Sequence, residues 1–209
     1  STESKKQTGD ASKTFMAKFA ILIRSPVFWL LGGAYFICGF TTAGVVKVHL
    51  IPYAASCGFT IITAAWATSF LAGFDMVGMV LSGYLTDRIS RPRLLGSVYF
   101  LRALSFILLF FITDNVALLF IFAVIFGTLD FATVPPTAGL MASHLGVSTM
   151  GFNMGILFLG HSLGGALGSV AGGWLFDLFQ TYDWTWIMAL TLALVAAVLA
   201  WSVPEKREK

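Results

Sequence analysis

Charged side chains are scarce in this sequence. Asp, Glu, Lys and Arg make up 11% of the 209 residues, whereas hydrophobic residues make up 57%. A soluble domain carries about 25% charged residues, so the surface of a soluble globule cannot be built from this composition. The scarcity of charge therefore indicates an integral membrane protein.

Several functional motifs are also missing. The sequence has no Gly-x-x-x-x-Gly-Lys-Ser/Thr string to bind ATP, and no nucleophile or metal cluster at a spacing that predicts an enzyme. Cys38 and Cys57 are the only cysteines, which predicts unpaired thiols and no metal site. The basic residues are scattered between apolar segments, which argues against nucleic acid as a partner. We expect no enzymatic activity and no cofactor.

Six long apolar segments dominate what is present. A helix needs about 20 mostly apolar residues to cross a bilayer, and lipid offers no hydrogen-bond partner to open strand edges. The segments also lack the alternating polarity of membrane β-strands. The sequence therefore predicts an all-α polytopic membrane protein with six transmembrane helices. These run approximately over Val27–Val46, Ile61–Leu85, Leu94–Ile112, Val116–Ala142, Thr149–Phe176 and Trp184–Val203.

The remaining residues predict the domain division. Residues 1–25 are polar and basic and indicate a cytoplasmic linker, in which Phe15–Ile23 is expected to form an amphipathic helix on the membrane surface. Residues 26–204 form the six-helix domain, and residues 205–209 form a cytoplasmic tail. Because neither an initiator Met nor a cleavable signal is present, we expect the chain to begin part-way through a longer protein or to have been cut.

Lys and Arg predict the orientation, because cytoplasmic loops carry an excess of both. Five precede the first segment, three lie between the second and third, and three follow the sixth. All fall on one side if the segments alternate, and Lys47 is expected in a loop on the other side. Both termini are therefore predicted to be cytoplasmic. The loop around residues 144–148 would also be cytoplasmic, although it lacks Lys and Arg.

Four ionisable residues lie within the apolar segments, where a charge costs several kcal/mol. Asp75 and Arg102 are each expected about 12 Å from the cytoplasmic end of adjacent helices, which predicts a structural ion pair or a proton or substrate site. Asp130 and His161 lie near mid-membrane, where they are expected to form a titratable pair or a polar link between helices. These four residues are our candidates for substrate binding and proton coupling.

Proline and glycine mark two of the segments. Pro135 and Pro136 are expected to kink or break the fourth helix, either beside a binding site or as a structural hinge. The fifth segment has a glycine at every fourth position, which lets another helix approach closely, in a static contact or in one that moves. These glycines are Gly160, Gly164, Gly168 and Gly172.

The loop GYLTDRISRPR resembles the signature loop of the major facilitator superfamily of transporters, whose usual pattern is Gly-x-Leu-(small)-Asp-Arg-x-x-Arg followed by basic residues. The matching residues are Gly83, Leu85, Asp87, Arg88, Arg91 and Arg93. The resemblance implies a cytoplasmic gate in which Asp87 lies near a helix N-terminus or pairs with Arg88 and Arg91. The alternative is that the arginines only fix the topology.

The chain as a whole resembles the C-terminal six-helix half of a 12-helix member. FDMVGMVLSGYL is similar to the eighth helix of monocarboxylate-transporter-like members: Asp75 and Gly83 match, whereas Met79 replaces an Arg taken to bind the substrate carboxylate. LDFATVPPT and GHSLGGALGS look like a bacterial branch of that group. The resemblance implies that the first, second, fourth and fifth helices line a cavity. Asp75, Asp130 and His161 are then cavity residues, and Arg102 is a structural partner of an Asp.

These features predict secondary transport of a small solute, with an organic anion as a candidate, by alternating access and with proton coupling. The expected partners are the solute, membrane lipid, and an N-terminal six-helix half or a second copy of the chain. The expected location is a bacterial inner membrane. A non-transporting six-span sensor or scaffold is the alternative. We expect no transport by this chain alone unless it pairs with a copy of itself.

Overall fold

The computed structural model describes residues 16, 18–113 and 115–206. Most of the predicted linker, residue 114 and the last three residues of the predicted tail therefore lie outside the described residues. Within the described part of the chain, all regular elements are helical, and six spans are long and apolar enough to cross a membrane. The prediction of an all-α polytopic membrane protein is confirmed.

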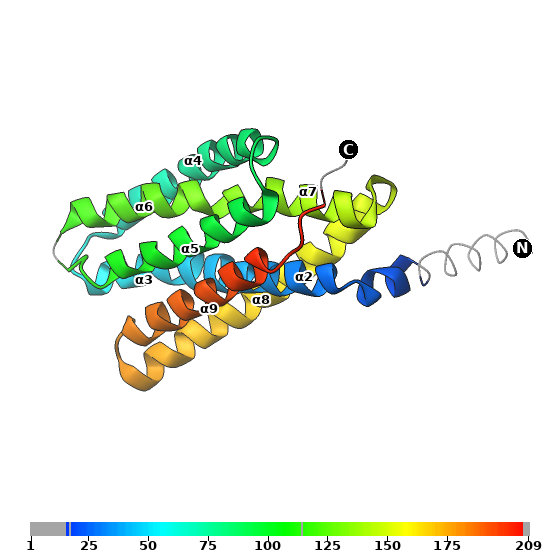
Figure 1. Cartoon of the computed structure of the whole chain (residues 1–209). Coiled ribbons are helices and arrows are strands. Elements are labelled where there is room, and N and C mark those ends of the chain that lie inside the picture. The colour runs from blue at the N-terminus through cyan, green and yellow to red at the C-terminus, as the bar shows by residue number, and fades with distance from the viewer. Residues whose placement is uncertain (1–15, 17, 114, 207–209) are drawn as a thin grey trace, which may run out of the picture.

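The six spans run lengthwise beside one another (Figure 1). Three of them include short non-α segments, which are one π-helix (η1) and two 3-10 turns (η2 and η3). The first span consists of α2 (Pro26–Cys38), η1 (Gly39–Val46) and α3 (Lys47–Ser56). The second span is α4 (Ile61–Thr86), and the third is α5 (Arg91–Leu109). The fourth consists of α6 (Val116–Asp130), η2 (Phe131–Thr133) and α7 (Val134–Leu145), the fifth of η3 (Val147–Thr149) and α8 (Met150–Phe179), and the sixth is α9 (Asp183–Trp201).

The first span is longer than predicted. Its helical path continues through η1 into α3 and ends at Ser56, so the span is 31 residues long. The prediction that placed Lys47 in a loop was therefore wrong. A charge usually ends an apolar run, whereas here two carboxylates pair with the ammonium inside the bundle.

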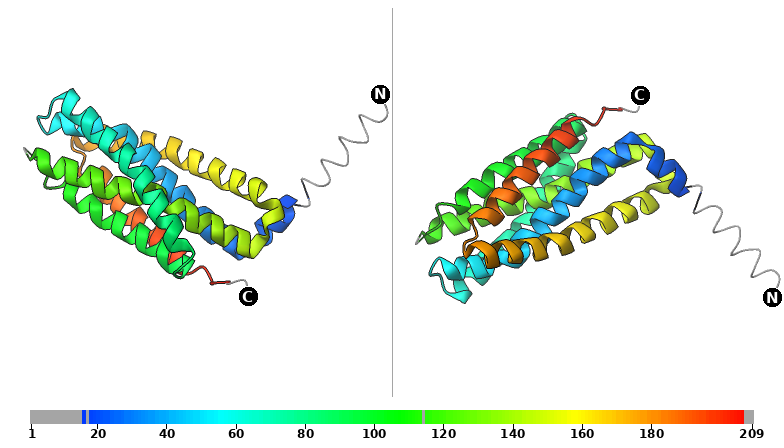
Figure 2. Two further views of the ribbon diagram at one scale, coloured as in Figure 1. Left: turned by 90° about the horizontal axis from the view of Figure 1, so that it is seen from above. Right: turned by 90° about the horizontal axis from the view of Figure 1, so that it is seen from below.

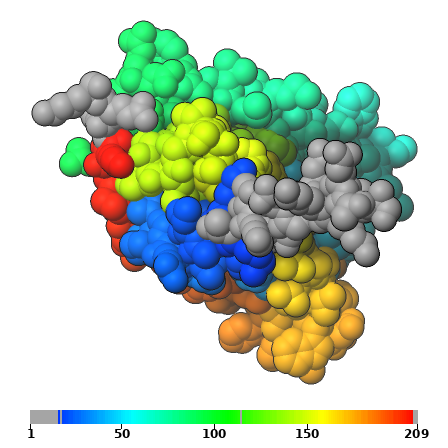
Figure 3. Space-filling view, turned by 90° about the vertical axis from the view of Figure 1, so that its right-hand side faces the viewer, coloured from blue at the N-terminus to red at the C-terminus, as the bar shows by residue number. Residues whose placement is uncertain are grey.

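One end of the bundle carries the basic segments. The helical residues 18–24, the α4–α5 connection and residues 202–206 lie at this end (Figure 1), which Figure 3 views directly. The backbone N–H of Arg91 donates to Glu205 Oε1 at 3.3 Å, so the connection contacts the C-terminal segment. The connections at the opposite end contain no Lys or Arg in the sequence. Because Lys47 lies within the bundle, the charge asymmetry is sharper than predicted.

The helices pack in an order that differs from their order in the chain. The contacts of α5 are mainly with α9 and α6, and those of α4 are mainly with α6. Three apolar clusters form the core of the described residues: the first joins η1, α3, α4, α5, α6 and α9, the second joins α2, α5, α7, α8 and α9, and a small third one joins α5 and η2. Helix α8 runs along one side of the bundle (Figure 2). Both α4 and α8 turn many apolar side chains outward, including Trp66, Val80, Leu167 and Val170.

The glycines of α8 allow close contact with the first span. A Cβ added at Gly164 or Gly168 would overlap main-chain carbonyl oxygens of α2 and η1. At Gly172 the added atom would meet the ring of His49. Gly160 differs, because no neighbouring atom lies within 4 Å of an added Cβ. Close packing therefore occurs at three of the four glycines.

Candidate functional site

The fourth span is interrupted just after Asp130. Helix α6 ends there, the 3-10 turn η2 follows, and Pro135 and Pro136 lie in the first turn of α7. Proline has no backbone N–H, so Pro136 cannot bond to the carbonyl of Ala132. The hydroxyl of Ser82 on α4 donates to that carbonyl instead, at 2.5 Å. The interruption thus leaves main-chain groups that side chains from other helices satisfy.

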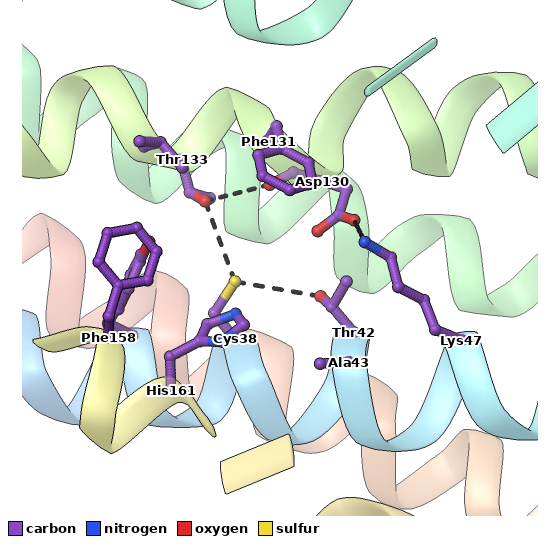
Figure 4. Close-up of a pocket in the computed structure, with 11 residues that line it drawn as sticks. Cys38, Thr42, Ala43, Lys47, Asp130, Phe131, Thr133, Phe158 and His161 are labelled. Atoms are coloured by element: carbon purple, nitrogen blue, oxygen red, sulfur yellow. Dashed lines mark hydrogen bonds and ion pairs between the residues drawn. The ribbon is translucent and has the colours of Figure 1, made fainter. Parts of the chain in front are cut away.

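A second irregular segment, η1, lies across from this interruption. Its hydrogen bonds follow the wider π-helical spacing, which occurs frequently at functional sites. Cys38 directly precedes η1 and Lys47 directly follows it. The Cys38 Sγ lies 3.9 Å from Thr133 Oγ1, so the two irregular segments are in contact. Figure 4 shows both segments with their side chains.

Lys47 connects carboxylates of two other helices. Its Nζ lies 2.9 Å from Asp130 Oδ2 (Figure 4) and 3.6 Å from Asp75 Oδ2. The side chains of Asp130 and Asp75 are 5% and 10% exposed, whereas that of Lys47 is 38% exposed. The Lys47 Nζ also lies 4.9 Å from the centroid of the Phe131 ring, a cation–π arrangement. One cation is therefore shared by two nearly buried anions.

Arg102 contributes the second cation of this cluster. Its guanidinium is fully buried, and Nη2 lies 3.8 Å from Asp130 Oδ1. Nη2 also donates to the carbonyls of Leu129 and Asp130, at 2.6 and 2.7 Å. Nη1 donates to Cys38 Sγ at 3.0 Å and to Thr42 Oγ1 at 3.2 Å. With Lys47 and the two carboxylates ionised, the cluster carries no net charge.

The predicted ion pair between Asp75 and Arg102 was wrong. Asp75 pairs with Lys47, and Arg102 pairs with Asp130. The prediction rests on equal depth on two helices joined by a short loop. In the structure α4 and α5 share few contacts, so equal depth did not bring their side chains together.

A cavity of about 80 Å³ lies beside the charges. One water needs about 10–15 Å³ of such space, so the cavity has room for a few waters or a few solute atoms. Lys47, Asp130 and His161 line it, together with aromatic rings such as Tyr35 and Phe158 (Figure 4). The lining comes from α2, η1, α3, η2, α7 and α8 and from the end of α6. The site thus combines charges, an imidazole and apolar rings.

His161 shares this cavity with Asp130 but is not its partner. The His161 ring centroid lies 5.1 Å from that of Tyr35 and 6.5 Å from that of Phe158. The carboxylate of Asp130 forms ion pairs with Lys47 and Arg102 instead. The hydrogen-bonded pair that we expected between Asp130 and His161 does not form in this structure, although both side chains face the same cavity.

The basic loop lies far from this site, at the end of the bundle. The Arg88 guanidinium carbon lies 4.2 Å from the centroid of the Tyr84 ring. Arg91 Nη1 donates to the carbonyl of Gly139 at 3.1 Å. Arg91 therefore links the start of α5 to α7, which is the part of the fourth span that follows the interruption.

The expected pairing within the loop is absent. Asp87 is exposed, and the ion pairs of the described residues do not include one with Arg88 or Arg91. The predicted ion pair of Asp87 with Arg88 or Arg91 was therefore wrong. Arg88 lies over an aromatic ring and Arg91 donates to a main-chain carbonyl instead. Arg93 is exposed. An added Cβ at Gly83 would lie 4.0 Å from Pro135.

Sequence reasoning missed Lys47, which joins the two carboxylates. A signal was present in the sequence, because the apolar run continues after this lysine. Its further residues are Val48, Leu50, Ile51, Tyr53 and Ala54. A single helix extending to Ser56 would have placed the ammonium within the membrane and required a carboxylate nearby. Cys38 and Thr42 were also missed as partners of Arg102, and their small polar side chains gave no comparable signal.

Six membrane-crossing helices around a charge cluster, with one helix broken beside it, are typical of membrane transport proteins. The sequence profile described as Major Facilitator Superfamily matches residues 31–209. The chain belongs to this family of transporters, and it is not an enzyme.

Curated relatives agree with this family. The chain is 29% identical over 180 residues to the Uncharacterized MFS-type transporter YcxA of Bacillus subtilis, covering 84% of this chain and 43% of the relative. It is 28% identical to Monocarboxylate transporter 13 of Rattus norvegicus, covering 75% and 37%. It is 31% identical to a Multidrug resistance protein B homolog of Mycobacterium tuberculosis, covering 75% and 28%. The chain spans less than half the length of these relatives.

Proposed function

We propose that the chain is the C-terminal half of a secondary active transporter that moves a small solute by alternating access. The observation that supports this most directly is the lysine shared by two carboxylates beside a cavity in the membrane interior. Charges at this depth are costly and mark solute or ion pathways. The relatives are about twice as long, which supports an N-terminal six-helix half as the partner, packed on outward-facing apolar surfaces.

The solute proposed is a small organic anion that binds with a proton. Lys47 has two acceptors, at 2.9 and 3.6 Å, so its ammonium needs only a small shift to change partner. Protonation of Asp130 would remove one of the two attractions and free the ammonium for an anionic group. Because Met79 stands where similar transporters carry an Arg taken to bind the substrate carboxylate, α4 lacks this cation. In this proposal Lys47, beside Asp75, binds the anion instead. Relatives named as monocarboxylate transporters are compatible with an anionic solute.

The orientation proposed places the basic end of the bundle in the cytoplasm of a bacterium, with the helices in the inner membrane. Positively charged connections favour the cytoplasmic side, and they gather at one end in the structure. Alternating access would then open the cavity first to one side and then to the other. The basic loop, with Arg91 bonded to α7, is placed to gate the cytoplasmic opening.

Uptake by the complete gene product tests the proposal. Vesicles would be given small organic anions and neutral analogues at external pH 5.5 and 7.5, with external pH recorded. We expect anion uptake to be faster at low pH and to alkalinise the medium. Asp130→Asn should reduce uptake at least about tenfold and remove its pH dependence, because an amide cannot take up the proton.

His161→Ala and Asp183→Asn complete the set. His161 lines the cavity, so we expect its loss to lower uptake, whereas Asp183 begins α9 at the opposite end and serves as the matched control. Unchanged uptake with an unchanged pH profile in Asp130→Asn would contradict proton coupling through this carboxylate. The present chain expressed alone should show no uptake unless two copies pair, and adding the N-terminal half should restore it.

A further inference from the structure

The two irregular segments beside the cavity meet at a single side chain. Arg102 Nη1 donates to Cys38, which precedes η1, and to Thr42, which lies within η1. Nη2 donates to the carbonyls of Leu129 and Asp130, which precede η2. The planar group thus bonds to η1 through one nitrogen and to the break in the fourth span through the other.

The ion-paired residues lie at the ends of these same segments. Lys47 is the first residue after η1, and Asp130 is the last residue before η2. The 2.9 Å separation of Lys47 Nζ and Asp130 Oδ2 therefore depends on how η1 lies against η2. We propose that Arg102 is a positioning residue, which holds η1 against η2 so that Lys47 and Asp130 meet. The inference rests on the proposed function only in treating this pair as part of the transport site.

The chemistry of the site requires arginine in particular. A guanidinium presents donors in a rigid fork, whereas the single ammonium of a lysine is a compact point charge on a flexible stem. The Arg102 side chain is fully buried, so water does not replace the donors if they are removed. Carbonyl groups without a donor in the membrane interior are costly, so without the fork the break near Leu129 would rearrange.

A disulfide measures this contact without any solute. Cys38 Sγ lies 3.9 Å from Thr133 Oγ1, so Thr133→Cys places two sulfurs within the range where small adjustments allow a bond. The complete gene product would carry Thr133→Cys with Cys57→Ala and be oxidised with copper phenanthroline. Mass spectrometry of peptides would quantify the bond between positions 38 and 133.

Arg102→Lys and Arg102→Gln are compared in this background. Arg102 also donates to Cys38 Sγ, so changing it can alter the reactivity of this thiol as well as its position. To correct for reactivity, the disulfide yield of each variant is divided by the rate at which a monofunctional maleimide labels Cys38 in that variant without Thr133→Cys. We expect the normalised yield to fall at least about tenfold in both variants. Ser105→Ala is the control on the same helix, since the Ser105 hydroxyl donates to the carbonyl of Arg102 within α5, and its yield should match that of the unchanged protein.

A normalised yield in Arg102→Lys equal to that of the unchanged protein would overturn the inference. Failure of Arg102→Lys to fold, judged by thermal unfolding, would also overturn it, because the role would then be general stability. The measurement does not depend on uptake. A lost cross-link with normal uptake would therefore count against the transport role of the pair, while leaving the positioning role of Arg102 intact.

Discussion

At the scale of single residues, Lys47 shows how charges are accommodated in the membrane interior. The ammonium has two nearly buried carboxylate partners and an aromatic ring, yet 38% of its side chain stays exposed. A buried pair is weak evidence of net stabilisation, but removing one member leaves an uncompensated charge. The cluster is therefore best tested by changes that alter its charge balance.

Lys47→Met should destabilise the protein by about 2 kcal/mol. This is below the roughly 3–5 kcal/mol for breaking a fully buried pair, because the Lys47 side chain is partly exposed. Adding Asp75→Asn returns the cluster to zero net charge and should recover at least half of the loss. Denaturant unfolding of the purified protein in detergent measures both values. Lys206→Met is the exposed control, and equal destabilisation of the single and double variants would contradict the charge argument.

The candidate residues could be chosen from the sequence, but their partners could not. Asp75, Asp130 and Arg102 stood out because ionisable groups are rare in apolar segments, and the structure places all three in one cluster. Pairing depends on which helices pack together and on which way each helix is turned. The sequence carries little information on either, so the Asp75–Arg102 pair was wrong and Lys47 was missed.

At the scale of the elements, the broken fourth span depends on donors from its neighbours. Pro136 removes the N–H that would bond to Ala132, and Ser82 of α4 supplies a hydroxyl in its place. The cost of leaving a buried carbonyl without a partner is roughly 1–3 kcal/mol. The break is therefore stabilised by a contact between two spans that are separate in the chain.

Ser82→Ala should destabilise the protein by about 1–3 kcal/mol, and Pro136→Ala should rescue it. An alanine at position 136 provides a backbone N–H four residues after Ala132, where a helix would use it. We expect the double variant to recover at least half of the loss in denaturant unfolding.

The matched control is Pro135→Ala. Its new N–H would be aimed at the carbonyl of Phe131, which already accepts a hydrogen bond from the N–H of Val134. Rescue of Ser82→Ala by Pro135→Ala to the same degree would show that general helix propensity, rather than the missing donor, explains the effect.

The glycines of α8 provide a second test at this scale. Gly164→Ala should lower stability by about 1–3 kcal/mol, because the added methyl group overlaps a carbonyl of the first span. Gly160→Ala should be neutral or stabilising by up to about 1 kcal/mol, since alanine favours a helix and no atom lies nearby. Thermal unfolding of both variants checks this, and equal shifts would contradict the packing argument.

The helices were predictable where apolar runs had clear ends and were not where local geometry changed. Pro135 and Pro136 indicated an irregularity in the fourth span, but the turn η2 precedes them because proline disturbs the carbonyls behind it. The π-helix η1 carries no comparable mark. This segment packs closely against α8, a contact that a local reading of residues 39–46 does not reveal.

At the scale of the whole molecule, the charge asymmetry defines two unlike ends. Ile89 lies in the basic α4–α5 connection and is 43% exposed, whereas Ile61 begins α4 at the other end and is 71% exposed. If the basic end is cytoplasmic, these two positions lie on opposite sides of the membrane.

Labelling of intact cells tests this orientation. In a background with Cys38→Ala and Cys57→Ala, a membrane-impermeant maleimide should label the Ile61→Cys variant at least about tenfold faster than the Ile89→Cys variant. Permeabilised cells should label both variants, which controls for the reactivity of each thiol. Labelling of Ile89→Cys alone in intact cells would reverse the proposed topology.

The balance of two cations and two anions at the site has an electrical consequence. A membrane voltage does work on a moving charge, about 2.3 kcal/mol per elementary charge for every 100 mV. With all four groups ionised, the charges of Lys47, Arg102, Asp75 and Asp130 sum to zero, so a membrane field exerts no net force on this cluster. In the proposed transport cycle this cluster would therefore add no charge movement of its own, and the solute and any accompanying proton would contribute their own charges to the current.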